Sequence, residues 1–313
     1  MMKIIKTILI LILSINVAFA EKNIVVILDW FENPNHAPLF VAKDNGYFKE
    51  QGLSVKLVGP ANPSDPPKLV AANKAEIAIT YQPQLIEQIN NGLPLIRIGT
   101  LIDKPLDCIT VLASSDINSI KDLKNKRIGY SAGSMHQLVI KTMLEHHGLS
   151  LKDIKSVNVN FDLTQGLLAK KIDAATGMMR NFEIIQMELL NKPARIFLPE
   201  ESGVPKYSEL VFVSNPNNLD KKTLKKFLLA LQQGVTYLKK NPEKSWQKFA
   251  DIRPNLNNKL NKKAWFASIN LFANNPATFN KYEWEQFIDF MYTNKLIKEK
   301  QSVDKYAIDL SKE

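Results

Sequence analysis

Short hydrophobic runs rich in β-branched residues alternate with amphipathic stretches through the first two thirds of the chain. Runs of this length and composition predict β-strands. We expect strands at residues 23–29, 54–58, 76–81, 95–101, 109–113, 127–130, 156–160, 172–176 and 210–214.

The stretches between these runs have the periodicity and the end signals of helices. One helix is expected over residues 37–45, ending at Gly46, and another after Asp65, ending near Asn73, which can take a left-handed turn. Beyond Asp220 only helical patterns occur, with apolar residues recurring on one face.

Alternation of strands and helices predicts an α/β architecture. Breaks near Pro105 and Pro205 flank the middle block. We therefore expect two α/β lobes joined by a two-strand hinge, with residues 21–105 plus 214–313 in one lobe and residues 106–213 in the other. Such hinges close around ligands.

The first twenty residues have the features of a cleavable signal peptide. Lys3 and Lys6 precede an apolar stretch, and Ala18-Phe19-Ala20 matches the cleavage pattern. The alternative is an uncleaved membrane anchor, but the apolar stretch is shorter than the span of about 20 residues that a bilayer needs. We expect export to the periplasm.

Composition narrows the classes of function. Cys108 is the single cysteine, so neither a disulfide framework nor a thiol metal cluster is expected. The net charge is +10, but the lysines are dispersed in pairs such as Lys225-Lys226 and are not interleaved with aromatic residues. We expect no nucleic-acid partner, no metal and no cofactor.

The segment LDWFENPNH, residues 28–36, follows the first expected strand. Ligands of open α/β sheets sit outside the carboxyl ends of strands, so this loop is a candidate binding segment. Trp30 offers a stacking face or, alternatively, closes the edge of the core. The candidate ligand-binding residues are Asp29, Trp30, Asn33, Asn35 and His36.

The third expected strand ends in Tyr81 and Gln82, which the same rule directs into a crevice. Trp30 and Tyr81, at the ends of two strands, could hold a planar ring between them. An aromatic pair of this kind contributes on the order of 1 kcal/mol beyond burial.

Residues 129–133, GYSAG, match the nucleophile elbow of hydrolases. A catalytic triad needs a histidine that can reach Ser131, yet the histidines that follow it all lie on the next expected helix. Hydrolysis is therefore rejected. Ser131, Gly133 and Ser134 instead offer hydroxyl and N–H groups to polar or anionic ligand atoms, a role compatible with helix capping by Ser134.

The segment GMMRNFE, residues 177–183, follows the eighth expected strand. A carboxylate only accepts hydrogen bonds, so Glu183 in a cleft requires an amino donor or a protonated ring nitrogen. The alternative is a surface ion pair between Glu183 and Arg180.

Six segments carry a family resemblance that spans most of the first two thirds of the chain. In order, they read LDWFENPNHAPLFVA, GYFKEQGLSVKLV, NPSDPPKLVAANKAEIAITYQPQ, LKNKRIGYSAGS, VNVNF and GMMRNFE. Together they resemble the periplasmic binding proteins that import thiamine pyrimidine precursors, formylaminopyrimidine and hydroxymethylpyrimidine. This group also includes the fungal-type thiamine pyrimidine synthase.

The resemblance implies a type II periplasmic-binding-protein fold, an ABC transporter permease as partner and a monomeric chain. The ligand would be a 4-amino-2-methylpyrimidine stacked on Trp30 and Tyr81, with its amine and a ring nitrogen at Glu183. Members often carry an aromatic residue where Met179 stands, which bears on ligand identity. The expected ligand-binding set is Asp29, Trp30, Asn33, His36, Tyr81, Gln82, Ser131, Gly133, Ser134, Asn160, Met179, Asn181 and Glu183.

Two other functions remain open. The synthase holds pyridoxal phosphate on a lysine and has a cysteine-rich iron site, but Tyr81 occupies that lysine position and Cys108 stands alone. Tyr81 has no amine for a Schiff base, so catalysis is not expected. A binding protein for another solute, such as a sulfonate, a riboflavin-like ring or a nucleobase, has the same fold.

Overall fold

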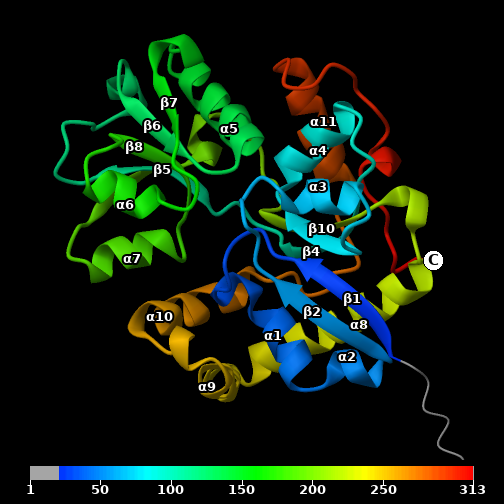
Figure 1. Cartoon of the computed structure of the whole chain (residues 1–313). Helices are drawn as coiled ribbons and strands as arrows, with labels where there is room; N and C mark the ends of the chain where they lie inside the picture. The colour runs from blue at the N-terminus through cyan, green and yellow to red at the C-terminus, as the bar shows by residue number, and fades with distance from the viewer. Residues whose placement is uncertain (1–20, 313) are drawn as a thin grey trace, which may run out of the picture.

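The computed structural model describes residues 21–312, apart from the side chains of residues 133–137. The expected signal peptide at residues 1–20 lies outside the described residues. Figure 1 shows two α/β lobes, each built on its own sheet, with the second lobe in green beside the blue and cyan strands of the first. The expected fold class is confirmed.

The sheet of the first lobe has the strand order β2-β1-β3-β10-β4. β1 runs parallel to both of its neighbours, whereas β10 runs antiparallel to β3 and β4. These strands are β1 (Lys22–Ile27), β2 (Leu53–Val58), β3 (Ile77–Thr80), β4 (Ile96–Ile102) and β10 (Leu210–Ser214).

The sheet of the second lobe has the order β7-β6-β8-β5-β9. β6 is parallel to β7 and β8, and β5 is antiparallel to β8 and β9. These strands are β5 (Asp107–Leu112), β6 (Arg127–Tyr130), β7 (Lys155–Asn158), β8 (Ala174–Met179) and β9 (Ala194–Phe197).

Helices cover both sheets. The first-lobe core is extended by the long α8, which packs its apolar face on α1 and α2. The helices are α1 (Ala37–Asp44), α2 (Tyr47–Glu50), α3 (Pro66–Ala71), α4 (Gln82–Asn90), α5 (Gly133–His146), α6 (Leu163–Leu168), α7 (Glu183–Leu189), α8 (Lys221–Lys240), α9 (Pro242–Ile252), α10 (Lys259–Ser268) and α11 (Lys281–Thr293). Among residues 21–312, no helix combines the length and the apolar character that crossing a bilayer requires.

Two differences from the strand predictions exceed one or two residues at a strand end. β9 was not predicted, because its four residues are only partly buried at a sheet edge and include Arg195. β8 was predicted at residues 172–176 but runs to Met179, because it continues through Gly177 (φ +93°) opposite an irregularity in β5. The glycine marks a bulge rather than the end of the strand.

Two chain crossings join the lobes. The first passes from β4 to β5, and the second returns from β9 to β10. Glu209 of the second crossing ties them together, because its Oε2 accepts the N–H groups of Leu106 (2.5 Å) and Asp107 (2.9 Å). The boundaries at residues 105 and 213 stay predictions. Since β10 pairs in the first sheet, we propose that the second crossing ends before Leu210.

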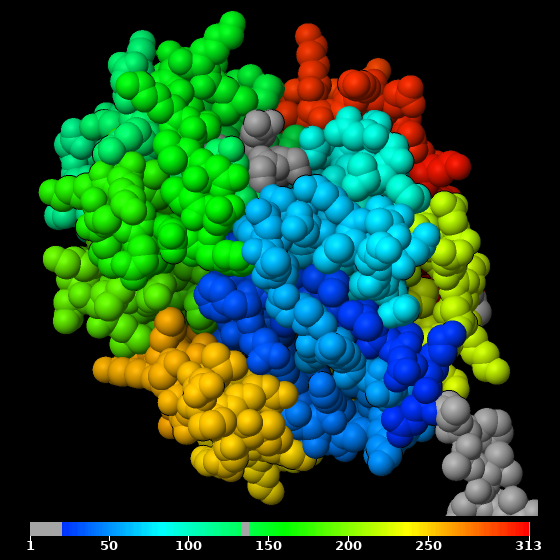
Figure 2. Space-filling model, in the orientation of Figure 1, coloured from blue at the N-terminus to red at the C-terminus, as the bar shows by residue number. Residues whose placement is uncertain are grey.

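The two lobes contact each other directly. Trp30 of the first lobe packs edge-on against Phe161 of the second, with ring centroids 4.6 Å apart. Asn181 donates from Nδ2 to the Oδ1 of Asn35 (2.5 Å) and to the Oγ of Ser268 (2.7 Å). On the face in Figure 2, green atoms of the second lobe meet blue atoms of the first.

Gly234 tests the packing of α8 on α1. A Cβ at this position would lie 2.5 Å from the carbonyl oxygen of Pro38 and 3.0 Å from the Cβ of Ala42. Gly234→Ala should lower the free energy of unfolding by about 1–3 kcal/mol through overpacking, although alanine is otherwise the better helix former. Urea unfolding measures this change.

The matched control is Leu229→Ala, at an exposed position of the same helix. It should change stability by less than about 0.5 kcal/mol. A Gly234→Ala protein as stable as the parent would show that α8 and α1 are not in close contact.

Candidate functional site

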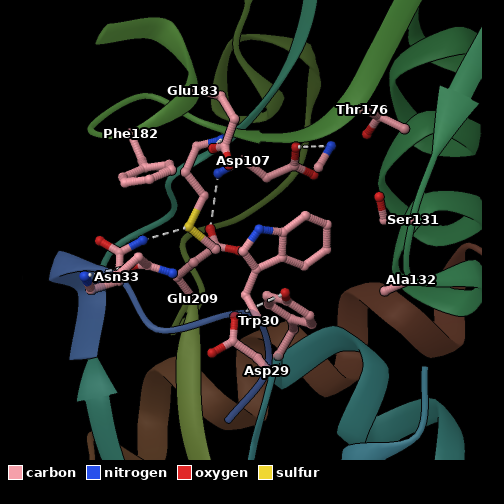
Figure 3. Close-up of a pocket in the computed structure, with 14 residues that line it drawn as sticks. Asp29, Trp30, Asn33, Asp107, Ser131, Ala132, Thr176, Phe182, Glu183 and Glu209 are labelled. Atoms are coloured by element: carbon pink, nitrogen blue, oxygen red, sulfur yellow. Dashed lines mark hydrogen bonds between the residues drawn. The ribbon is translucent and has the colours of Figure 1, made fainter. Parts of the chain in front are cut away.

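A pocket of about 590 Å³, part of it open to solvent, lies between the lobes. Its walls come from the carboxyl ends of β1, β3, β6 and β8, and from the amino ends of the antiparallel strands β5 and β10. The lining residues are Asp29, Trp30, Asn33, Asn35, Tyr81, Asp107, Ser131, Ala132, Thr176, Gly177, Met179, Phe182, Glu183 and Glu209. Figure 3 shows them around the Trp30 ring.

Asp29 is the buried polar anchor of the first-lobe wall. Its Oδ1 lies 2.9 Å from Nε2 of His36, and its Oδ2 accepts the hydroxyl of Tyr81 (3.1 Å). Nδ1 of His36 accepts the N–H of Asn33, so Nε2 carries the proton that is donated to Asp29. Asp29 therefore keeps both oxygens occupied and fixes the Tyr81 ring.

Burial and the neighbouring Asp29 carboxylate raise the pKa of Tyr81 well above its usual value. Tyr81 thus remains a neutral phenol that donates to Asp29. Its hydroxyl is committed within the protein, which leaves the ring face as its contribution to a ligand.

Aromatic side chains from both lobes form another part of the pocket wall. Trp30 is partly exposed, contacts Phe31 at 5.5 Å as well as Phe161, and its Nε1 has no hydrogen-bond partner among the described residues. Phe182 lines the pocket and contacts Phe31. Because these residues come from both lobes, lobe closure completes the wall.

Glu183 begins α7 and is 8% exposed. Its Oε2 accepts the N–H of Met179 at 2.8 Å. Burial raises the pKa of Glu183 to about 7, although backbone hydrogen bonds oppose the shift. The alternative ion pair with Arg180 is not formed, because Arg180 instead binds Glu200 at 2.6 Å.

Asp107 and Glu209 form a second pair of carboxyl groups in the pocket. Burial and the charge of Glu209 raise the pKa of Asp107, and burial likewise raises the pKa of Glu209. Asp107 Oδ1 accepts the N–H of Gly177 (2.7 Å). Both carboxyl groups are therefore held by backbone N–H groups rather than by a cation.

The structure brings a majority of the expected site residues together. Those that line the pocket are Asp29, Trp30, Asn33, Asn35, Tyr81, Ser131, Met179 and Glu183. Gly133 and Ser134 begin α5, but their side chains lie outside the described residues.

The remaining expected residues act behind the lining or away from it. His36 supports Asp29, and Asn181 joins the contact with Asn35 and Ser268. Gln82 is bonded to the backbone of Ser208 through its Oε1 (2.7 Å), and Asn160 is exposed and offers its carbonyl oxygen to the Ser131 hydroxyl.

Sequence reasoning missed Asp107, Thr176, Gly177, Phe182 and Glu209 as lining residues. Asp107 and Glu209 stand at the amino ends of antiparallel strands, which the rule of carboxyl ends does not cover. One signal in the sequence could have indicated both residues: each is a carboxylate within a few residues of an expected crossing, near Pro105 or Pro205.

The lining is acidic. Among its described residues, four carry carboxyl groups and none is lysine or arginine. Desolvated carboxyl groups without a cation favour a ligand that donates hydrogen bonds or carries positive charge. Within the described part of the chain, no group of three or more His, Cys, Asp or Glu residues is arranged to hold a metal ion.

Comparison with known proteins identifies the family. The model described as NMT1/THI5 like matches residues 33–245. A putative thiamine biosynthesis protein of Haemophilus influenzae is 41% identical over 294 residues, 94% of each chain. The chain belongs to the NMT1/THI5-like family. The expected resemblance is confirmed.

Other members of the NMT1/THI5-like family differ in what their names describe. A formylaminopyrimidine-binding protein of Halalkalibacterium halodurans is 32% identical over 228 residues, 72% of this chain and 69% of the relative. A 4-amino-5-hydroxymethyl-2-methylpyrimidine phosphate synthase of Saccharomyces cerevisiae is 28% identical over 275 residues, 84% of this chain and 80% of the relative. The family therefore contains proteins named for binding and proteins named for synthesis.

Solved structures place this family member among periplasmic binding proteins by fold. The alkanesulfonate-binding protein SsuA of Xanthomonas axonopodis pv. citri, bound to MOPS, superposes with a TM-score of 0.72. It shares 14% identity and covers 92% of this chain and 98% of its own. Sequence similarity this low supports the fold alone.

The raised pKa values predict how stability depends on pH. A carboxyl group whose pKa is raised on folding stabilises the protein below its unfolded pKa, and this contribution is lost as pH rises through the folded pKa. The melting temperature of the ligand-free protein should therefore fall as the pH rises from about 4, the unfolded pKa of these carboxyl groups, to about 8, and it should fall less in Glu183→Gln. Calorimetry measures this; each kcal/mol shifts the melting temperature by about 2–4 °C.

Glu285→Gln, at an exposed position of α11, is the control and should follow the parent curve. Parallel curves for Glu183→Gln and the parent would contradict a raised pKa at Glu183.

Proposed function

We propose that the protein is the solute-binding component of an ABC importer and that it captures a thiamine pyrimidine precursor, a 4-amino-2-methylpyrimidine derivative, in the periplasm. The observation that carries the proposal is the pairing of aromatic faces with buried carboxyl groups in a pocket whose described lining has no basic side chain. A planar, donor-rich heterocycle matches both features.

Each wall of the pocket has a part in this recognition. Tyr81, held by Asp29, and Trp30 offer ring faces for stacking. Glu183 Oε2 is occupied by the Met179 N–H, so its other oxygen is the one directed to a ligand amine. A pKa near 7 lets Glu183 ionise when a donor or a protonated ring nitrogen arrives.

The acidic lining favours this ligand over a sulfonate. The structurally similar SsuA is named for alkanesulfonates, and an anionic sulfonate would face the carboxyl groups of Asp29, Asp107, Glu183 and Glu209 here. Repulsion between buried like charges opposes such binding. Fold similarity therefore does not transfer the ligand.

The side chains around the pocket also favour a binding protein over a synthase. Tyr81 cannot form a Schiff base. Cys108 is buried, donates its thiol to the carbonyl of Met178, and has a pKa raised by burial to about 12, which makes it a poor nucleophile and a poor iron ligand. Recognition of the closed lobes by a permease would complete transport.

A ligand panel tests the proposal. Isothermal titration of the mature protein should give saturable binding of 4-amino-2-methylpyrimidines and no measurable heat with taurine or ethanesulfonate. The acidic lining is the physical reason for this selectivity. Saturable binding of a sulfonate, together with no measurable heat for any aminopyrimidine, would overturn the proposed ligand class.

Glu183 gives a second test. Glu183→Ala should weaken aminopyrimidine binding by about 1–3 kcal/mol, the usual loss of a hydrogen bond to a charged group. Glu188→Gln, on the exposed face of the same helix α7, is the matched control and should bind as the parent does. Unchanged affinity in Glu183→Ala would remove Glu183 from the site.

A further inference from the structure

Among the lining residues, Trp30, Asp107 and Thr176 each have a buried polar atom without a partner in the described part of the chain, and two of these atoms belong to the second lobe. The Oδ2 of Asp107 and the Oγ1 of Thr176 are buried and make no hydrogen bond within the described part of the chain. The two residues are 2% and 1% exposed, and both line the pocket. A buried polar group without a partner costs about 1–3 kcal/mol, so both atoms are candidates for ligand contact.

The fold holds the Asp107 carboxyl group in place. Asp107 begins β5, and its Oδ1 accepts the N–H of Gly177, the residue that follows Thr176 in β8. The Asp107 N–H is in turn donated to Glu209. Asp107 is therefore anchored through one oxygen and through its backbone, which leaves Oδ2 as the free acceptor.

We propose that Asp107 and Thr176, supported by Glu209, form a second polar subsite that receives a hydrogen-bond-donating substituent of the ligand, a hydroxyl or a primary ammonium group, and rejects a phosphate or carboxylate there. This inference rests on the proposed function, because it concerns the substituent that the aminopyrimidine ring carries.

The register of the second sheet places this subsite beside Glu183. Asp107 is paired with Met179 across β5 and β8, and the Met179 N–H is the group that Glu183 accepts. In a 4-amino-2-methylpyrimidine, the amine on C4 and the substituent on C5 are adjacent. With the amine at Glu183, the C5 substituent is directed to the neighbouring position.

The charges around the subsite select a donor. Glu209 and Glu183 contribute carboxyl groups, and the nearest guanidinium, Arg180, is engaged by Glu200 and by the Asp107 carbonyl oxygen. A phosphate would add negative charge beside these carboxyl groups, and the Arg180 guanidinium is already engaged elsewhere. An ammonium group would instead donate to the free Oδ2 of Asp107.

The competing receptor for an anion is the start of α5, where Ser131 and Ala132 also line the pocket. A phosphorylated ligand would use that helix end. Binding of a phosphorylated analogue therefore separates the two interpretations.

The experiment uses four ligands with the same ring and different C5 groups: methyl, hydroxymethyl, aminomethyl and phosphooxymethyl. Titration of the mature protein should give the tightest binding for aminomethyl or hydroxymethyl, weaker binding for methyl, and the weakest for phosphooxymethyl. The loss from hydroxymethyl to methyl should be about 3- to 10-fold, the value of one hydrogen bond.

Thr176→Val removes the hydroxyl and keeps the shape and strand propensity. It should reduce the hydroxymethyl-to-methyl affinity ratio about 3-fold or more while leaving affinity for the methyl ligand unchanged. Thr142→Val, a buried threonine of α5 away from the lining, is the control and should keep the ratio. Asp107→Asn should lower affinity for the aminomethyl ligand most.

The outcomes are distinguishable. An unchanged ratio in Thr176→Val, or phosphooxymethyl binding as tight as hydroxymethyl, would overturn the subsite while leaving pyrimidine binding intact. Failure of all four ligands to bind would overturn the proposed function itself. Thr176→Val decides the matter even if Asp107→Asn does not fold.

Discussion

Burial of carboxyl groups in one interlobe pocket is the constraint on which the rest of this structure depends. Removing an ionised carboxylate from water costs several kcal/mol unless hydrogen bonds or a cation compensate. Asp29 is compensated within the protein by His36 and Tyr81. Glu183, Asp107 and Glu209 are compensated mainly by backbone N–H groups, and their raised pKa values record the remaining cost. A donor-rich ligand supplies what is missing.

The strand order explains why these groups converge. In each sheet, one antiparallel strand enters from the opposite lobe: β5 in the second and β10 in the first. Their amino ends therefore lie at the same edges as the carboxyl ends of the parallel strands. Glu209, just before β10, reaches the start of β5, so the residue that links the crossings also lines the pocket. The Glu209 side chain therefore belongs both to the link between the crossings and to the pocket wall.

Local patterns in the sequence were sufficient for much of this arrangement. Periodicity located β1, β3 and β6, and the rule of carboxyl ends then led to Asp29 and Tyr81, while the GYSAG motif at a helix start led to Ser131; all three residues line the pocket. The helix that was expected to end at Gly46 does so, with Asp44 as its last residue.

The failures have physical causes. Asp107 and Glu209 meet because the two crossings, 102 residues apart in the chain at this contact, lie beside each other, and no local pattern contains that contact. Thr176 was placed at the end of a strand that in fact continues through Gly177. Gln82 and Asn181 were polar residues at strand ends, but they satisfy protein groups, Ser208 and Asn35, instead of facing the pocket.

Charge, and not fold, restricts the ligand of this pocket. The structurally similar SsuA is named for alkanesulfonates, whereas the pocket here is lined by carboxyl groups. The fold requires only that the ends of strands meet between the two lobes. The side chains at those ends determine whether the electrostatic potential in the pocket is positive or negative. Because a buried charge must be matched or neutralised, the acidic lining restricts ligands more severely than pocket shape does. The chain's own chemistry thus narrows the ligand to a donor-rich aromatic ring.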